Sequence, residues 1–187
     1  MIMLKKMVVA MVLAMPTLAL AQQGPYFSVG AAVGNTDLSD LENPGSVTDD
    51  EVQRVVIGGG YQFNENLALE AVYLSNVENT VETGPFKQTL DHDGIQLSVL
   101  AYVPFTAQFS AFGKVSTNYL NVAYQDNAGF SLDDSGMHLG VGAGLAYQVS
   151  DQLGLRATFE RLMITDVGSS SGDFDVDQVA LALNYSF

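Results

Sequence analysis

The chain has 187 residues, no cysteine, 21 acidic and seven basic residues, and a formal net charge of −14. This balance argues against nucleic acid or another polyanion as a partner, so any charged partner should be cationic. Without cysteine there is no disulfide framework, and an exported protein of this composition must be held by strand pairing and packing.

The N-terminus has the three parts of a cleavable signal peptide. Residues 1–6 carry two lysines, and residues 7–20 are almost entirely apolar. The small residues Ala19 and Ala21 follow as a cleavage site. We therefore predict a signal peptide over residues 1–21 and one domain over residues 22–187.

The rest of the chain contains no apolar run near the roughly 18 to 20 residues of a transmembrane helix. Instead, eight stretches alternate apolar residues with small or polar ones, as β-strands do. The stretches are 26–34, 53–63, 67–75, 94–103, 107–119, 136–149, 153–161 and 176–187. A helix could not use a pattern of period two.

In chain order, each stretch separates an apolar face from a small or polar one. The first opposes valine and phenylalanine to glycine, serine and alanine, the second leaves Arg54 opposite its apolar face, and the third leaves Glu70 there. The fourth, 94–103, repeats the pattern. The fifth is the least regular, because Phe112 falls on the same face as Lys114.

The last three stretches are more regular. In 136–149 apolar residues alternate with glycines and His138, and 153–161 places Arg156 and Glu160 on its polar face. The eighth stretch ends the chain in strict alternation.

Alternation alone also fits a soluble lipocalin-like barrel with an apolar interior. The apolar faces of the eight stretches, however, carry no charged residue, which hydrocarbon demands, and the opposite faces suit a narrow lumen. Aromatic residues on the apolar faces gather beside the short connections, as an interfacial girdle would. They are Phe27, Tyr61, Phe63, Phe105, Tyr147, Tyr185 and Phe187. We predict an all-β fold, an eight-stranded antiparallel transmembrane up-and-down β-barrel whose first and last strands pair.

The connections between the stretches are alternately short and long. The short ones are 64–66, 104–106 and 150–152, and the long ones are about 36–51, 76–93, 120–134 and 162–175. Barrels in the bacterial outer membrane place short turns in the periplasm. We therefore expect periplasmic termini and extracellular long loops, and six, four, three and four acidic residues lie in or beside these loops, 17 of the 21.

The C-terminal stretch carries the most specific resemblance to a known family. Val179, Leu181, Leu183, Tyr185 and Phe187 occupy every second position, and residues 25–30 begin the domain with Pro-Tyr-Phe-Ser-Val-Gly. Both features resemble the OmpA-like and OmpX-like outer-membrane barrel superfamily. The resemblance implies that the C-terminus is an assembly signal read by the barrel-assembly machinery, and that outer-membrane lipids and lipopolysaccharide surround a barrel that we expect to be monomeric.

Six titratable residues are expected in the lumen. They are Arg54, Glu70, Lys114, His138, Arg156 and Glu160. We expect the two carboxylates to pair with Arg156, Lys114 and Arg54 in a network that plugs the barrel, because unpaired buried charges are costly. The alternative is a narrow gated pore for ions or small solutes, in which those pairs exchange partners.

A third hypothesis is a lipid A-modifying enzyme. His138 is followed by Gly140, so the His-x-Ser arrangement of outer-membrane deacylases is missing, and we predict no catalytic residue and no cofactor. His92 is expected in a solvated loop. Asp173, Asp175 and Asp177 are weak candidates for binding Ca²⁺ or Mg²⁺, without the spacing of a known metal motif.

The sequence thus favours a non-enzymatic outer-membrane barrel. We expect it to contribute to envelope integrity and to cell-surface interaction through acidic extracellular loops.

Overall fold

The computed structural model describes residues 23–37, 46–49, 51–83, 86–126, 131–167 and 172–187, so the predicted signal peptide lies outside the described residues. The described residues form nine antiparallel strands. Their bounds are β1 Gly24–Asp37, β2 Ser46–Asp49, β3 Glu51–Asn64, β4 Leu67–Thr83, β5 Phe86–Pro104, β6 Phe109–Asp126, β7 Ser131–Gln148, β8 Leu153–Val167 and β9 Gly172–Ser186. Within these ranges no helix is long and apolar enough to span a membrane.

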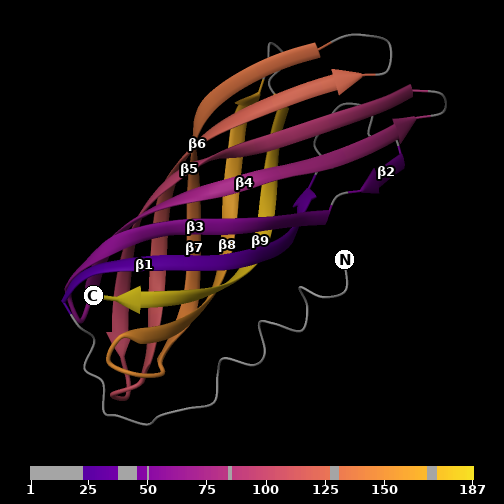
Figure 1. Cartoon of the computed structure of the whole chain (residues 1–187). Coiled ribbons are helices and arrows are strands. Elements are labelled where there is room, and N and C mark those ends of the chain that lie inside the picture. Colours follow the sequence, from indigo (N-terminus) through magenta and orange to yellow (C-terminus); the bar gives the residue numbers. More distant parts are fainter. Residues whose placement is uncertain (1–22, 38–45, 50, 84–85, 127–130, 168–171) are drawn as a thin grey trace.

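Eight of these strands close into a barrel (Figure 1). Strand β1 pairs with β3 on one side and with β9 on the other, from Tyr26↔Ser186 to Asp37↔Asp175. The ladder then runs through β8, β7, β6 and β5 to β4, which pairs back to β3. Closure leaves no unpaired edge inside the wall, where backbone groups without partners would cost several kcal/mol each. The predicted fold is confirmed, and the short strand β2 is an addition that pairs with β4 alone.

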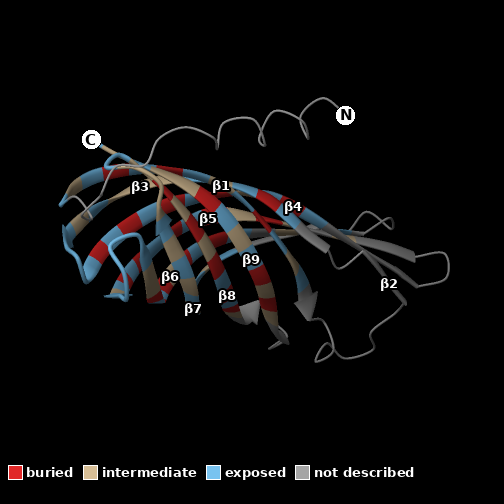
Figure 2. Cartoon of the chain, turned by 90° about the horizontal axis from the view of Figure 1, so that it is seen from below, coloured by how far each residue is buried: buried red, intermediate tan, exposed pale blue. Residues whose placement is uncertain are grey.

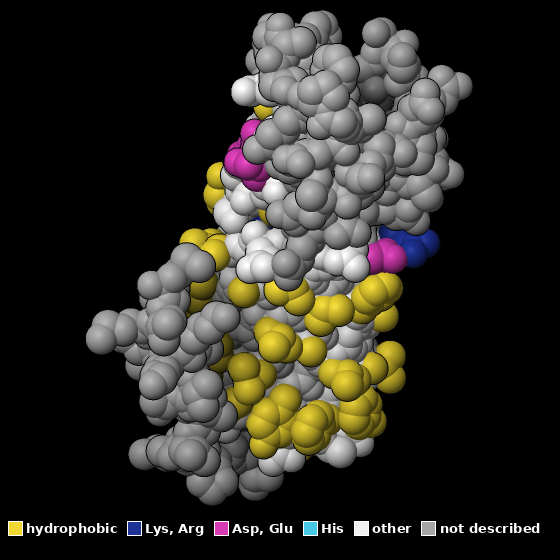
Figure 3. All heavy atoms as spheres, turned by 90° about the vertical axis from the view of Figure 1, so that its right-hand side faces the viewer, with side chains coloured by type: hydrophobic (Ala, Val, Ile, Leu, Met, Phe, Trp, Pro, Cys, Tyr) yellow, Lys and Arg dark blue, Asp and Glu magenta, His cyan; other side chains and the backbone are white. Residues whose placement is uncertain are grey.

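The alternation of the sequence corresponds to the two faces of the wall. Figure 2 shows buried and exposed residues alternating along the barrel strands. Side chains on the predicted apolar faces, such as Ile57, Leu97, Val115 and Leu181, are exposed on the outside. Figure 3 shows them gathered in a belt, with acidic and basic side chains beyond one border. This is the polarity of a barrel embedded in lipid, with an apolar exterior and a polar interior.

Aromatic side chains of the outer face lie in contact at the end of the barrel that holds the C-terminus. The ring centroids of Tyr61 and Phe63 are 5.1 Å apart, and those of Tyr185 and Phe187 are 5.3 Å apart. Phe109 also joins this group, because its ring lies 4.5 Å from Tyr147 and 6.3 Å from Phe105. The predicted girdle therefore lies along the short turns, where amphipathic rings suit an interface between apolar and aqueous phases.

The predicted long loops are wrong in extent. Residues 76–83 and 86–93 form a continuous hairpin, in which Glu78 pairs with Asp91, and the β6–β7 ladder reaches Gln125↔Ser131. The sequence hides these extensions because, beyond the apolar belt, the hydrophobic alternation ends. Backbone pairing continues without it.

The extensions make the barrel asymmetric. Strands β4 to β7 have 17 to 19 residues, whereas β1, β3, β8 and β9 have 14 or 15. Figure 1 shows the far ends of β4 and β5 opposite the end that holds the C-terminus. The β7–β8 ladder stops at Leu139↔Met163, so residues 131–138 of β7 pair with β6 on one side and, among the described residues, have no ladder on the other. We call residues 131–138 of β7, together with the far ends of β4, β5 and β6 that continue the same ladder, the projecting sheet.

Candidate functional site

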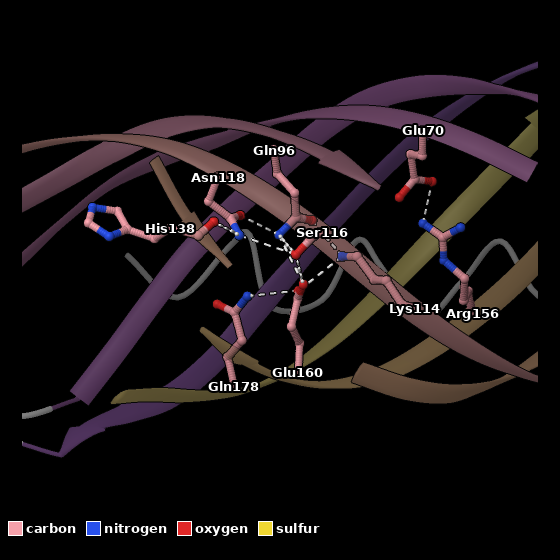
Figure 4. A network of polar contacts seen from close by, with 9 residues as sticks. All are labelled: Glu70, Gln96, Lys114, Ser116, Asn118, His138, Arg156, Glu160 and Gln178. Atoms are coloured by element: carbon pink, nitrogen blue, oxygen red, sulfur yellow. Dashed lines mark hydrogen bonds and ion pairs between the residues drawn. The ribbon is translucent and has the colours of Figure 1, made fainter. Parts of the chain in front are cut away.

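The six titratable residues predicted for the lumen all face it. Each is buried, with side chains that point away from the apolar belt. The structure separates the ion pairs into two clusters on different levels of the barrel (Figure 4). His138 joins the Glu160 cluster through Asn118, and Arg54 contacts His92 instead.

The cluster nearer the short turns is centred on Glu70. The Arg156 guanidinium on β8 donates to Glu70 Oε2 on β4 at 2.5 Å, and the Tyr26 hydroxyl on β1 donates to the same oxygen at 3.0 Å. Arg156 also reaches the Tyr102 hydroxyl at 3.5 Å, and its guanidinium lies 5.8 Å from the ring centre of Phe112. Strands from opposite sides of the barrel are thus joined through one buried ion pair.

Apolar side chains pack beneath that ion pair. Tyr26, Ala68, Leu100 and Phe112 form a buried cluster, so the residue that breaks the alternation of β6 fills the lumen. The glycines on the inward face of the wall make this possible. A Cβ at Gly144 would lie 2.5 Å from Phe112 Cζ and 2.2 Å from the Ala157 carbonyl oxygen, and one at Gly60 would lie 2.5 Å from the Tyr26 hydroxyl. Each inward-facing ring therefore lies across a glycine of the neighbouring strand, Phe112 opposite Gly144 and Tyr26 opposite Gly60.

The second cluster is centred on Glu160 of β8. Lys114 Nζ donates to Glu160 Oε2 at 2.9 Å and to Gln96 Oε1 at 2.5 Å. Gln96 Nε2 and Ser116 Oγ donate to Glu160 Oε1 at 3.0 and 2.8 Å, and Gln178 Nε2 donates to Oε2 at 3.3 Å. Figure 4 shows these side chains converging on the carboxylate from the surrounding strands. Four donors use about all the lone-pair sites that a carboxylate offers.

The uncharged members of this cluster were not singled out from the sequence. Gln96, Ser116, Asn118 and Gln178 are buried and join the network through amide and hydroxyl groups. Their positions on the inward face were available from the alternation. The charged residues alone indicate the ion pairs. The hydrogen bonds that complete the cluster come from amide and hydroxyl side chains on the same inward face.

Arg54 has a different partner from the one predicted. Its Nη2 atom lies 2.6 Å from His92 Nε2, and within the described part of the chain no carboxylate oxygen lies within ion-pair distance of it. The prediction of a solvated loop for His92 is wrong, since His92 is 1% exposed and lies in β5. The ladder continues through this position, so the chain places His92 inward and its neighbours Asp91 and Asp93 outward.

His138 is buried at the far side of the Glu160 cluster. Its carbonyl oxygen accepts a hydrogen bond from Asn118 at 3.4 Å, and Figure 4 shows its ring turned away from Glu160. The ring lies over Gly136, where a Cβ would come within 3.0 Å of His138 Nε2.

The border of the apolar belt carries an exposed ion pair. Arg161 on β8 is about half exposed, and it and Asp177 on β9 are both exceptions to the predicted absence of charge on the apolar faces. It donates to both carboxylate oxygens of Asp177, at 2.6 and 2.5 Å, and lies 3.5 Å from Asp175. Two of the three weak metal candidates therefore share a guanidinium, and the side chain of Asp173 lies outside the described residues. Among the described residues, no group of three or more His, Cys, Asp or Glu is placed to hold a metal ion.

The residues of the predicted assembly signal lie along β9 on the outer face. Val179, Leu181 and Tyr185 are exposed, Leu183 is half-buried, and Phe187 ends the chain at the aromatic girdle. The same strand closes the barrel against β1, with Leu183 opposite Val29.

Basic and acidic residues are divided unevenly between the lumen and the rest of the protein. Seven basic residues less the two in the predicted signal peptide leave five, and three of these, Arg54, Lys114 and Arg156, are buried in the lumen. Lys87 and Arg161 remain, and Arg161 is paired with aspartate. Among the acidic residues whose side chains the structure describes, Glu70 and Glu160 are the buried ones. The interior is therefore rich in cations and the remainder of the protein strongly anionic.

Comparison with solved structures supports the architecture. The attachment invasion locus protein Ail of Yersinia pestis, solved with the heparin analogue sucrose octasulfate, is 17% identical, with a TM-score of 0.59 over 89% of this chain and 100% of that chain. Neisserial surface protein A is 15% identical, with a TM-score of 0.63 over 88% and 97% of the two chains. The Escherichia coli outer membrane protein W is 10% identical, with a TM-score of 0.57 over 89% and 99%. At these identities the likeness shows the fold alone.

No curated protein sequence matches the chain significantly. The family model of the outer membrane protein beta-barrel domain, in contrast, matches residues 7–187, which is nearly the whole sequence. With the closed eight-stranded wall and its apolar exterior, this match establishes that the chain belongs to the outer membrane protein beta-barrel family, whose location is the bacterial outer membrane.

Proposed function

We propose that this protein is a non-enzymatic barrel that contributes to envelope integrity and binds a cationic partner at the cell surface. In this proposal the short turns and both termini face the periplasm, and the projecting sheet stands outside the cell. Outer-membrane barrels of this kind place their short turns in the periplasm, which supports the orientation.

The observation that carries the proposal is the separation of charge. Three basic residues are buried in the lumen, so the outside of the protein has few cations to balance its carboxylates. Exposed and half-exposed acidic side chains, among them Glu78, Asp91 and Asp93, lie on strands that lead into the projecting sheet. Complementary potential steers partners and suppresses those of like charge, so a basic protein segment is favoured.

The same charge distribution distinguishes this chain from one of its structural neighbours. Ail was solved in complex with a sulfated heparin analogue. A polyanion of that kind would meet a surface on which Lys87 and the aspartate-paired Arg161 are the basic residues left outside the lumen. We therefore propose that a related fold here serves a partner of the opposite charge.

The projecting sheet offers a second means of recognition. Its β7 edge lacks a ladder at residues 131–138, and an exposed edge can pair with an extended segment of another chain. A basic segment that adds a strand there would combine main-chain hydrogen bonds with charge attraction.

The lumen contacts favour a plug over the narrow pore. Rings and leucines fill the level of Glu70, and the Glu160 carboxylate has four donors, so conduction would require several buried contacts to open together. The hypothesis of a pore stays a prediction that single-channel recording of the reconstituted protein, with and without Glu70→Ala, can test. Conductance steps above membrane noise would revive it.

Binding of a basic peptide to the purified barrel in detergent tests the surface proposal. Lysine-rich peptide should bind more tightly than a heparin fragment, and the variant Glu78→Gln, Asp91→Asn should weaken that binding. The matched control is Glu65→Gln with Asp151→Asn, which removes exposed carboxylates from the short turns at the other end. Equal loss in both variants would show that net charge acts without a site, and tighter heparin binding would contradict the proposal.

A deletion strain tests the cellular role. We expect greater detergent sensitivity, reduced attachment to surfaces that display basic protein, and an unchanged lipid A mass spectrum. An altered lipid A spectrum would instead support the enzyme hypothesis.

A further inference from the structure

Arg54 is the lumen cation whose charge the barrel does not balance directly. It is 3% exposed, and its Nη2 atom donates to His92. Its Nε and Nη1 atoms are buried and lack a hydrogen-bond partner in the described structure. The other two lumen cations, Arg156 and Lys114, each bind a carboxylate at 2.5 and 2.9 Å.

The contact with His92 fixes the chemistry of the pair. A guanidinium can only donate hydrogen bonds, so His92 Nε2 must accept and the ring proton must lie on Nδ1. His92 Nδ1 is also buried and without a partner. The pair therefore presents unpartnered N–H donors at Arg54 Nε, Arg54 Nη1 and His92 Nδ1, with one positive charge and no free acceptor.

The lumen carboxylates are committed elsewhere. Figure 4 shows Glu160 surrounded by its donors and Glu70 bound to Arg156. Glu70 is opposite Gly60, which lies six residues from Arg54 along β3, or about 20 Å at 3.3 Å per residue. Glu160 has four donors already.

The carboxylates beside His92 are turned outward. Asp91 accepts from Asn76 and Asp93 from Tyr73, and the exposed Tyr73 ring lies on the outer face. The strand between Arg54 and His92, β4, contributes the buried apolar side chains of Leu74 and Val77. A guanidinium buried beside such groups without direct contact to a carboxylate is unfavourable, and a compact anion can offset that cost.

We propose that the unpartnered N–H groups of Arg54 bind a small monovalent anion, a halide or a short carboxylate, in the part of the lumen beside His92. The anion would give Arg54 the direct contact with a negative group that no described carboxylate makes, since Glu160 acts on Arg54 only from a distance. This site is independent of the proposed surface function, since it lies inside the wall.

Chloride NMR of the purified barrel in detergent tests the site in solution. The wild-type protein should broaden the ³⁵Cl resonance beyond detergent alone, and Arg54→Gln should lose that excess linewidth. Arg161→Gln is the control, because it removes an exposed arginine that is paired with aspartate. Displacement of chloride by formate would show that the site also takes carboxylates, and its absence would define a halide site.

Crystals of the wild-type protein grown with bromide test the location, and they decide the matter if Arg54→Gln fails to fold. We expect an anomalous peak within hydrogen-bonding distance of Arg54 Nε or Nη1. Water at that position without anomalous signal, or chloride broadening that persists unchanged in folded Arg54→Gln, would overturn the proposal.

Discussion

The Glu70–Arg156 pair gives a sharp test of how the lumen is held together. In Arg156→Met, the Glu70 carboxylate keeps the Tyr26 hydroxyl but loses the guanidinium 2.5 Å away, in a place where its side chain is 1% exposed. Removing one partner of a buried pair costs about 3 to 5 kcal/mol of unfolding free energy, because the other charge remains buried. We expect Arg156→Met to be destabilised by that amount.

The double variant Glu70→Gln, Arg156→Met should be more stable than Arg156→Met alone. It leaves no buried charge, and Tyr26 can donate to the glutamine, so the coupling energy between the two sites should be about 2 kcal/mol or more. Urea unfolding in lipid vesicles, followed by circular dichroism, measures each value, since the chain has no tryptophan for fluorescence.

The exposed pair provides the matched control. Arg161 and Asp177 have side chains that are 49% and 39% exposed, so Arg161→Met should cost about 1 kcal/mol or less. The reasoning would be refuted if Arg156→Met cost no more than Arg161→Met, or if the double variant lost the full sum of its single changes.

Three further predictions concern residues in the wall of the barrel. Gly144→Ala should lower the unfolding free energy more than Gly113→Ala in the same urea assay, since a Cβ at Gly144 meets Phe112 and backbone while a Cβ at Gly113 meets nothing within 4 Å. Leu97→Arg, on the outer face, should cost about 2 to 4 kcal/mol in vesicles if it lies near the bilayer midplane, and a neutral effect there would contradict the membrane-facing assignment. Phe187→Ser should reduce the amount of barrel recovered from outer membranes while leaving refolding in vitro close to wild type, and an equal loss in both assays would show a structural role instead of an assembly signal.

The sequence predicted the wall well because period-two alternation reports burial directly. Every apolar face was assigned to the correct side, and the six titratable residues all face the lumen. The hydrophobic alternation ends at the border of the apolar belt. Beyond it the ladder of β4 to β7 continues, and buried side chains there, such as those of Val77 and His92, give no regular pattern.

The partners inside the lumen could not be predicted in the same way. Alternation places Arg54, Glu70 and Glu160 on the inward face but says nothing of their height or of the strand opposite, which depend on the shear of the closed barrel. Only closure shows that Glu160 meets Lys114 and that Arg54 meets a histidine. Phe112 looked irregular for a related reason, since the bare wall at Gly144 that accommodates its ring belongs to another strand.

The most direct test of the account is the topology of the barrel in intact cells. The chain has no cysteine, so single cysteine variants carry no background. A membrane-impermeant maleimide should label Gln125→Cys, at the exposed far end of β6, on whole cells, and Asp151→Cys, in a short turn, only after lysis. Leu97→Cys, on the apolar belt, should resist labelling in both states until detergent is added. Labelling of Asp151→Cys on whole cells would invert the orientation, and free labelling of Leu97→Cys would contradict the membrane-facing belt itself.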